Sequence, residues 1–203
     1  MVMTRILAIH PGTAYHCETL EAPRYARLFD ALVRPEELGD IDLSRFDIVL
    51  APCRTPASRL APHRACLEAY LAAGGAVVAM GETDQHLWLP SIRFTSVPTN
   101  WWWWLEPGAS LGLSIADPRH PLFARIGAND IAWHLHGVFA PPDGARSLID
   151  DAEGRSVLYL DEVTTKGRML VTSLDPFYHH GSHFMPAATR FLDGFLPWLK
   201  EEF

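Results

Sequence analysis

Short apolar runs that end at proline or glycine recur along the chain and predict buried strands. Each run is rich in aliphatic residues and is followed within two residues by Pro11, Pro52, Gly81 or Pro176. A continuous apolar run bounded by turn residues is typical of a strand that is buried on both faces. The predicted strands are residues 5–10, 47–51, 76–80 and 168–174.

Segments with helical spacing separate these runs. Apolar residues recur every three or four positions in residues 25–33, 60–71 and 184–199, which predicts three amphipathic helices. Gly74 and Gly75 follow the second of them, where a helix commonly ends. Strands that alternate with helices predict a parallel sheet, because parallel neighbours need a crossover connection.

The region 91–163 has a different pattern. It shows little helical periodicity, and residues 151–155 predict a hairpin turn between two short apolar runs. We expect this region to add antiparallel strands to one edge of the sheet. The sequence thus predicts an α/β fold over residues 1–203 as a single domain, with helices on both faces of a mainly parallel sheet. The runs of the extension are residues 92–97, 111–115, 131–139 and 156–160.

Composition supports a packed domain and excludes several classes of protein. The 203 residues are 48% hydrophobic and 20% charged, which is enough for a core and argues against disorder. The net charge of −7 argues against nucleic-acid binding, which needs a basic face. No apolar run approaches the roughly 20 residues of a membrane span, and residues 1–10 do not resemble a secretory signal. Three widely spaced cysteines indicate no disulfide framework, so we expect a cytoplasmic protein.

Polar side chains gather in the loops that follow the four predicted strands. In an open parallel sheet, ligands bind outside the carboxyl ends of the strands. Side chains of these types suit acid–base catalysis or metal binding, and a solvated polar loop is the alternative. The loops are residues 10–17, 52–56, 81–86 and 175–183. They hold Cys53, Arg54, Glu82, Asp175 and six of the ten histidines, namely His10, His16, His86, His179, His180 and His183.

Several sets of these residues are candidates for a site. Glu82 and Asp175 can act as general acid and base, with His179 as a third catalytic residue. The alternative for Glu82 is a structural role, in which its carboxylate accepts backbone N–H bonds and holds its own turn. His179, His180 and His183 offer imidazole ligands for a divalent metal such as zinc or manganese, or else hydrogen bonds to a polar ligand. We assign ligand binding to His10, His16, Arg54, His180, Trp102 and Trp104.

Four consecutive tryptophans, Trp101 to Trp104, are the most unusual feature of the sequence. Four adjacent rings cannot all face one core, so we expect some of them at a ligand cleft or against another subunit. If these rings pack against another subunit, the protein is a homo-oligomer, and we expect a dimer. His134 and His136 alternate with apolar neighbours and are interpreted as the polar face of a half-buried strand.

Three segments resemble the class I glutamine amidotransferase-like superfamily, and within it the trehalose-utilisation (ThuA-like) branch. They are AGGAVVAMGE (residues 73–82), HPLFARI (120–126) and KGRMLVTSL (166–174). The resemblance covers most of the chain. It implies a flavodoxin-like three-layer sandwich and a small polar, carbohydrate-like substrate.

The departures from this superfamily concern its chemistry. Amidotransferases carry a Gly-x-Cys-x-Gly elbow, where this chain has Glu82 at or within one position of the nucleophile. Their His-Pro-Glu segment corresponds here to Asp175, Pro176 and Phe177. Glutamine amidotransfer is therefore not expected. Two functions remain: a hydrolase or isomerase acting on a carbohydrate-like molecule, or a non-catalytic assembly module that uses the tryptophan run as an interface.

Overall fold

A mixed sheet organises the chain. The computed structural model describes residues 4–203, apart from the side chain of Trp104. Within that range ten strands follow the order β2-β1-β3-β4-β10-β9-β7-β5, with β8 beside β9 and β6 beside β8. The strands are β1 (Ile6–Ile9), β2 (Ala31–Val33), β3 (Ile48–Ala51), β4 (Ala76–Met80), β5 (Phe94–Ser96), β6 (Ser114–Ile115), β7 (Gly137–Phe139), β8 (Arg146–Asp150), β9 (Ser156–Asp161) and β10 (Arg168–Thr172).

Helices connect and cover the strands. The α-helices of the described residues are α1 (Ala14–Leu20), α2 (Ala57–Leu60), α3 (Arg64–Ala72), α4 (Pro176–Gly181) and α5 (Pro186–Glu201). The short 3-10 helices are η1 (Ala26–Leu28), η2 (Pro35–Asp40), η3 (Leu43–Arg45), η4 (Ala61–His63), η5 (Gln85–Leu87), η6 (Trp103–Leu105), η7 (Pro121–Ala124) and η8 (Ala128–Asp130).

Five neighbouring strands of the sheet, β2, β1, β3, β4 and β10, are parallel to one another. All residues of β1, β3 and β4 are buried, which explains why these strands are continuous apolar runs instead of alternating ones. Their carboxyl ends lie side by side, and β4 and β10 are direct neighbours. The loops after β4 and β10, which carry Glu82 and Asp175, therefore meet at one edge, as the sequence predicts.

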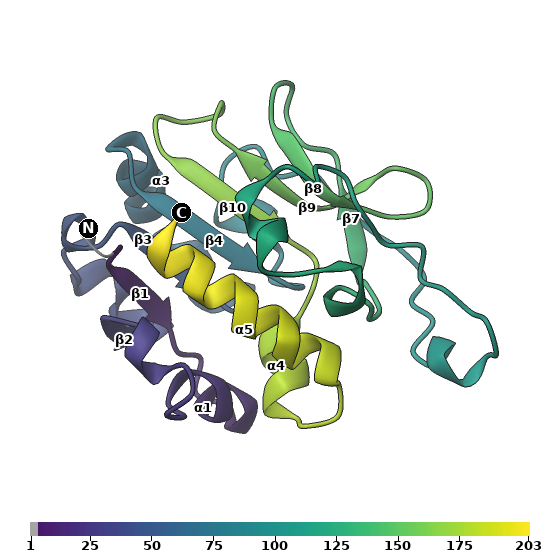
Figure 1. The fold of residues 1–203 in the computed structure, drawn as a ribbon. Coiled ribbons are helices and arrows are strands. Elements are labelled where there is room, and N and C mark those ends of the chain that lie inside the picture. The colour runs from purple at the N-terminus through teal and green to yellow at the C-terminus, as the bar shows by residue number, and fades with distance from the viewer. Residues whose placement is uncertain (1–3) are drawn as a thin grey trace.

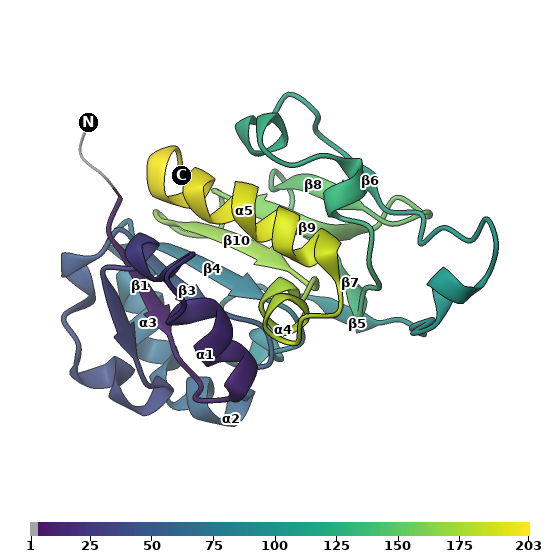
Figure 2. The same ribbon diagram turned by 60° about the horizontal axis from the view of Figure 1, so that its bottom comes forward.

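Helices lie on both faces of this parallel part, so the structure has three layers (Figures 1 and 2). One face carries α1, α4 and α5, and its core joins Ile48, Leu50 and Val78 to Phe191 and Phe195 of α5. The other face carries α2 and α3. Its core joins the alternate strand residues to the apolar side chains Leu60, Leu67 and Leu71. Alternation along the strands supplies both cores, since successive side chains point to opposite faces.

The region 91–163 extends the sheet with antiparallel strands. β9 pairs with β10 on one side and with β7 and β8 on the other, and every pairing from β10 outward is antiparallel. The predicted α/β fold with an antiparallel extension is confirmed. The segment that follows β5 projects beyond the sheet at the right of Figure 1 and carries η6.

The predicted helix over residues 25–33 is wrong. The short η1 is followed by β2, which pairs in parallel with β1. Asp30 sets this pairing, because its carboxylate accepts a hydrogen bond from the Ile6 N–H and its own N–H donates to the Ile6 carbonyl. Leu32 is 39% exposed, as alternation along a strand requires, whereas a helix would have buried it beside Val33.

Other segments also differ from the expected ones. The loops predicted over 10–17 and 175–183 contain the first part of α1 and all of α4. Pro176 fits the first turn of α4 because its φ is fixed and no N–H is needed there. Only the end of the strand expected over 131–139 is formed, as β7. The tryptophan run forms a turn followed by η6.

Candidate functional site

Asp175 is the centre of a buried polar cluster at the carboxyl end of β10. The residue is fully buried and forms the N-cap of α4. Its Oδ2 lies 3.1 Å from His136 Nε2 and 3.4 Å from Arg54 Nη2. Its Oδ1 lies 3.0 Å from His179 Nε2 and 4.0 Å from His134 Nε2. Three histidines and one arginine, from three parts of the chain, therefore surround one carboxylate. We call these five residues the Asp175 cluster.

Local geometry explains how the histidines converge. His179 follows Asp175 by four residues, about one turn of α4, so both side chains lie on the same face of the helix. His134 and His136 are two residues apart in the segment that leads into β7, and their ring centroids lie 5.2 Å apart. His134 Nε2 and His179 Nε2 are 3.1 Å apart, so the two segments meet directly above Asp175.

The surroundings of the cluster keep Asp175 ionised and His134 neutral at pH 7. Burial alone would raise the pKa of Asp175, but the adjacent imidazoles of His136 and His179 hold that pKa well below its usual range. Burial lowers the pKa of His134 to about 4, and the nearby Asp175 offsets this only in part. An anion and a neutral imidazole thus lie side by side.

Glu82 reaches the cluster through His136. Its Oε1 lies 3.1 Å from His136 Nδ1, so that this imidazole is placed between Glu82 and Asp175. The turn before Glu82 needs glycine, because Gly81 has φ +69 and a Cβ there would lie 2.3 Å from Cys53 Cβ. The Glu82 side chain is 51% exposed, so it links the buried cluster to solvent.

A cavity of about 580 Å³ opens above the cluster. His134, His179 and Arg54 contribute to its polar surface, whereas its walls are aromatic and apolar. The Trp101 ring lies 4.5 Å from the His134 ring and the Phe184 ring 4.9 Å from the His179 ring, centroid to centroid. The other residues that line it are Trp102, Trp103, Ala132, Tyr178 and Met185.

Arg54 lies at the rim between the cluster and the cavity. Its backbone has φ +61, an uncommon value for a residue with a side chain, and its guanidinium carbon lies 3.6 Å from the centroid of the Tyr178 ring. This stacking holds one face of the guanidinium while Nη2 contacts Asp175. The strained conformation points to a residue positioned for a ligand.

The structure brings together four of the residues that the sequence predicts for a site. Asp175, His179 and Arg54 belong to the Asp175 cluster, and Glu82 contacts it. Of these, only His179 and Arg54 line the cavity. Trp102 also lines it, whereas the side chain of Trp104 lies outside the described part of the chain.

His16 has a structural environment. Its Nε2 lies 2.9 Å from the Cys53 carbonyl oxygen and its Nδ1 2.7 Å from Thr13 Oγ1, so both ring nitrogens are used inside the protein. The ring is fully buried, and burial lowers its pKa to about 4. His16 therefore supports the loop that carries Arg54 and does not reach the cavity.

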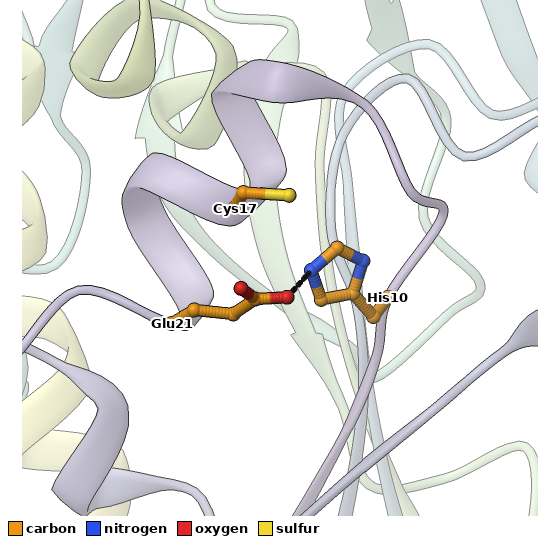
Figure 3. Close-up of side chains that lie close together, drawn as sticks. All are labelled: His10, Cys17 and Glu21. Carbon is orange, nitrogen blue, oxygen red and sulfur yellow. Dashed lines mark ion pairs between the residues drawn. The ribbon is translucent and has the colours of Figure 1, made fainter.

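His10 belongs to a second group, with Cys17 of α1 and Glu21 at the C-cap of α1 (Figure 3). The ligand atoms of these three residues lie within 4.8 Å of one another, as a metal site would require. However, His10 Nδ1 already accepts a hydrogen bond from the Gly12 N–H, and His10 Nε2 lies 2.9 Å from Glu21 Oε1 in an ion-pair contact. Contacts within the chain therefore account for both ring nitrogens of His10.

The predicted metal set of His179, His180 and His183 does not converge. His179 contacts Asp175, whereas His180 Nδ1 lies 2.9 Å from Thr189 Oγ1 of α5 and the exposed His183 lies 3.6 Å from Glu18. The reason is that α4 is helical, so His179 and His180 point about 100° apart around its axis. His180 also does not line the cavity above the cluster, although ligand binding was expected of it.

Two residues of the cluster, His134 and His136, were interpreted from the sequence as the polar face of a strand. Both are buried, and they face Asp175 across the sheet edge. The signal in the sequence was a pair of histidines two residues apart in an otherwise apolar segment, which places both on one side. Together with Asp175 they form a group whose ligand atoms lie within 4.8 Å of one another.

Comparisons with known proteins identify the fold. No family model matches the sequence, and no curated protein matches it. Among solved structures, a candidate GMP synthase component from Thermoplasma acidophilum superposes with a TM-score of 0.59 at 11% identity, over 97% of this chain and 96% of that one. This chain has a class I glutamine amidotransferase-like fold.

Two further structures of this fold are similar. A glutamine amidotransferase from Thermotoga maritima gives a TM-score of 0.57 at 10% identity, over 98% of this chain and 85% of that one. A candidate ThuA-like protein from Bacteroides uniformis gives 0.55 at 11% identity, over 95% and 89%. The resemblance to the amidotransferase-like superfamily and its ThuA-like branch is thus confirmed at the level of the fold.

Among the described residues 4–203, no cysteine lines the cavity. Cys53 is fully buried beneath Gly81, and its burial and the nearby Asp175 raise the pKa of its thiol. The Tyr178 N–H points to the Cys53 sulfur at 3.4 Å.

Within residues 4–203, no helix has both the length and the apolar character needed to cross a bilayer.

Proposed function

We propose that the chain is an enzyme that binds and transforms a small polar, carbohydrate-like molecule in the cavity above Asp175, and that it is not a glutamine amidotransferase. The observation that carries this proposal is the convergence of Arg54, His134 and His179 on the floor of an aromatic cavity, over a buried carboxylate. Buried charges are costly, and they are commonly found where an active site uses them.

The lining of the cavity favours a molecule with both an apolar face and polar groups. Sugars stack their C–H faces on aromatic rings, and Trp101 and Trp102 offer such rings. The guanidinium of Arg54 suits a hydroxyl or carboxylate group of the same molecule. The volume of about 580 Å³ is within the range of small-molecule sites and can hold one or two sugar rings.

The Asp175 cluster supports chemistry that needs a carboxylate anion held beside imidazole side chains. Asp175 remains charged at neutral pH and aligns His179, while His134 stays neutral because burial lowers its pKa to about 4. Glu82 holds the outer nitrogen of His136. Groups of this kind move protons in hydrolases and isomerases, either directly or by polarising a bound reactant.

The same geometry argues against glutamine hydrolysis. That reaction needs a thiolate that can form a thioester, and a carboxylate such as Glu82 cannot do so. The Cys53 thiol is buried beneath the turn, with a raised pKa, and does not line the cavity. The fold is therefore proposed to carry a different reaction from that of amidotransferases.

A thermal-unfolding screen tests the proposal. We expect at least one neutral sugar, sugar acid or polyol to raise the melting temperature of the wild-type protein, with about 2.7 kcal/mol of added stability at 100 times its Kd. The shift should be lost in Trp101→Ala and His179→Asn, and retained in His183→Ala, since His183 lies outside the cavity. A panel without any shift, or a shift that survives in both cavity variants, contradicts the proposal.

An assembly module is the second candidate. Trp102 and Leu105 are 64% and 60% exposed and lie close together in the segment after β5. Large exposed apolar side chains of this kind are typical of interfaces between subunits. On this view the tryptophan run contacts a second copy of the chain, and the cavity has no substrate.

A further inference from the structure

We infer that the Asp175 cluster is a binding site for a borderline divalent transition metal such as zinc, held by His134 Nε2, His136 Nε2 and the Asp175 carboxylate, with His179 Nε2 beside it. This inference deepens the proposed function, because it assigns the ion to the same cavity. It differs from the metal set that the sequence indicates, of which only His179 lies here.

The separations between the atoms fit a single ion. Zinc binds imidazole nitrogen and carboxylate oxygen at about 2.0–2.2 Å, so two atoms on one ion are at most about 4.4 Å apart. The distances from Asp175 to His136, His179 and His134 are 3.1, 3.0 and 4.0 Å, and His134 and His179 are 3.1 Å apart. Each of these four distances lies within that limit. The ligand atoms of His134, His136 and Asp175 all lie within 4.8 Å of one another.

Hydrogen bonding within the cluster is incomplete in a way that a cation would satisfy. Asp175 Oδ1 is buried and accepts no hydrogen bond, although His179 Nε2 lies 3.0 Å away. His134 and His179 direct their Nε2 atoms at one another, so a hydrogen bond between them needs a proton on one nitrogen and a lone pair on the other. A metal ion between these atoms accepts the lone pairs of both imidazoles and of the carboxylate.

The residues around the cluster are arranged like those that orient the ligands of a metal site. His136 presents Nε2 to Asp175 and Nδ1 to Glu82, so Glu82 can accept the Nδ1–H while Nε2 binds the ion. A carboxylate on the outer nitrogen of a ligand histidine fixes its tautomer and strengthens its binding. Arg54 contacts Asp175 at 3.4 Å from the side of Tyr178.

The donor set indicates the class of metal and its role. Imidazole nitrogens with one carboxylate suit zinc and similar transition metals, whereas magnesium and calcium prefer oxygen ligands. His134 and His179 line the cavity, so an ion between them faces the space where a substrate would lie. The ion would hold a hydroxyl or carbonyl oxygen of the polar molecule and draw electron density from it.

Zinc binding to the full chain, purified without a histidine tag and stripped with a chelator, tests this inference. We expect one zinc per chain by elemental analysis after gel filtration, and competition with a coloured zinc chelator to give its affinity. Magnesium should not be retained. Asp175→Asn should weaken zinc binding by more than about 100-fold, and Glu82→Gln, at an exposed outer position, by about 10–100-fold.

Two variants away from the cluster serve as matched controls. Cys17→Ser removes a possible ligand from the group with His10, and His183→Ala removes an exposed histidine; both should bind zinc as the wild type does. Absence of stoichiometric zinc in the wild type, unchanged binding in both Asp175→Asn and Glu82→Gln, or loss of zinc in Cys17→Ser overturns the inference. Because Glu82 is half exposed, its variant is expected to fold even if Asp175→Asn does not.

The metal inference and the proposed function can fail separately. Zinc binding is measured without any sugar, and the sugar-induced melting shift is measured with and without chelator. Zinc binding without any ligand shift would leave the metal site standing and overturn the carbohydrate-like substrate. A ligand shift with no zinc binding, unchanged by chelator, would overturn the metal site and leave the proposed function standing.

Discussion

His136 lies between two carboxylates, with Nε2 3.1 Å from Asp175 Oδ2 and Nδ1 3.1 Å from Glu82 Oε1. The imidazole and Asp175 are both buried, so neither group can exchange its partner for water. In chelator-treated protein, His136→Ala should lower the free energy of unfolding by about 3 kcal/mol, because Asp175 loses a hydrogen bond while it stays buried. Urea denaturation at pH 7 measures this loss.

The double variant His136→Ala/Asp175→Ala provides the control for that prediction. Removing both partners leaves no unpaired charge from this pair. The double variant should therefore lose less free energy of unfolding than the two single variants together, by at least about 1 kcal/mol. Strictly additive costs would contradict the contact between the two side chains.

Acid should destabilise the protein partly through His16. Its folded-state pKa is about 4, lowered first by burial and then by the nearby charges of His10 and Arg54, while the unfolded value is 6.5. The folded state therefore favours the neutral ring, and the stability it contributes is complete above pH 6.5 and is lost as the pH falls from 6.5 to about 4.

His16→Gln isolates this effect. The variant should be less stable at pH 7, because hydrogen bonds to Cys53 and Thr13 are weakened. Between pH 6.5 and 4 its stability should fall less steeply than that of the wild type, by roughly 3 kcal/mol in total. Parallel curves of unfolding free energy against pH would show that His16 titrates normally in the folded protein.

Gly81 should tolerate no side chain. Gly81→Ala places a Cβ 2.3 Å from Cys53 Cβ at φ +69, so we expect a loss of about 2–4 kcal/mol in the free energy of unfolding. Gly74→Ala is the matched control. Gly74 also has positive φ, at +103, but nothing lies within 4 Å of its Cβ position, so only the backbone cost of about 1–2 kcal/mol applies. Equal losses in the two variants would argue against close packing beneath the turn.

Trp102→Ala separates the enzyme from the assembly module. If Trp102 serves mainly the cavity, the variant keeps the sedimentation coefficient of the wild type and binds the stabilising ligand at least about tenfold more weakly. We expect this result. Conversion of a wild-type dimer into a monomer by this single substitution, with ligand binding unchanged, would support the assembly module instead.

Much of the framework could be predicted from the sequence because burial on both faces leaves a clear pattern. β1, β3, β4 and β10 are continuous apolar runs, and their turn residues fix where each strand ends. From those ends alone, Glu82 and Asp175 were expected at one edge of the sheet. The helix expected over residues 25–33 was wrong because five apolar residues match both a helical stripe and a short edge strand, and only the pairing of Asp30 with Ile6 decides between them.

The composition of the site was harder to predict. Asp175 and His179 are one helical turn apart, so their pairing follows from the sequence once α4 is known to be a helix. His134 and His136 reach them across the antiparallel extension, and no spacing in the sequence reports such a contact. His180 and His183 were grouped with His179 because they are close in sequence. In the structure α4 directs His180 toward α5, and His183, which follows the end of α4, lies beside Glu18 of α1.

Tryptophan fluorescence during a ligand titration reports directly on the cavity, because Trp101 and Trp102 line it above Asp175. We predict that a sugar, sugar acid or polyol which raises the melting temperature also changes the emission saturably. That change should be strongly reduced in Trp101→Phe, and the affinity should fall in Arg54→Ala. If no compound changes the emission, or if both variants respond as the wild type does, the cavity is not the functional site.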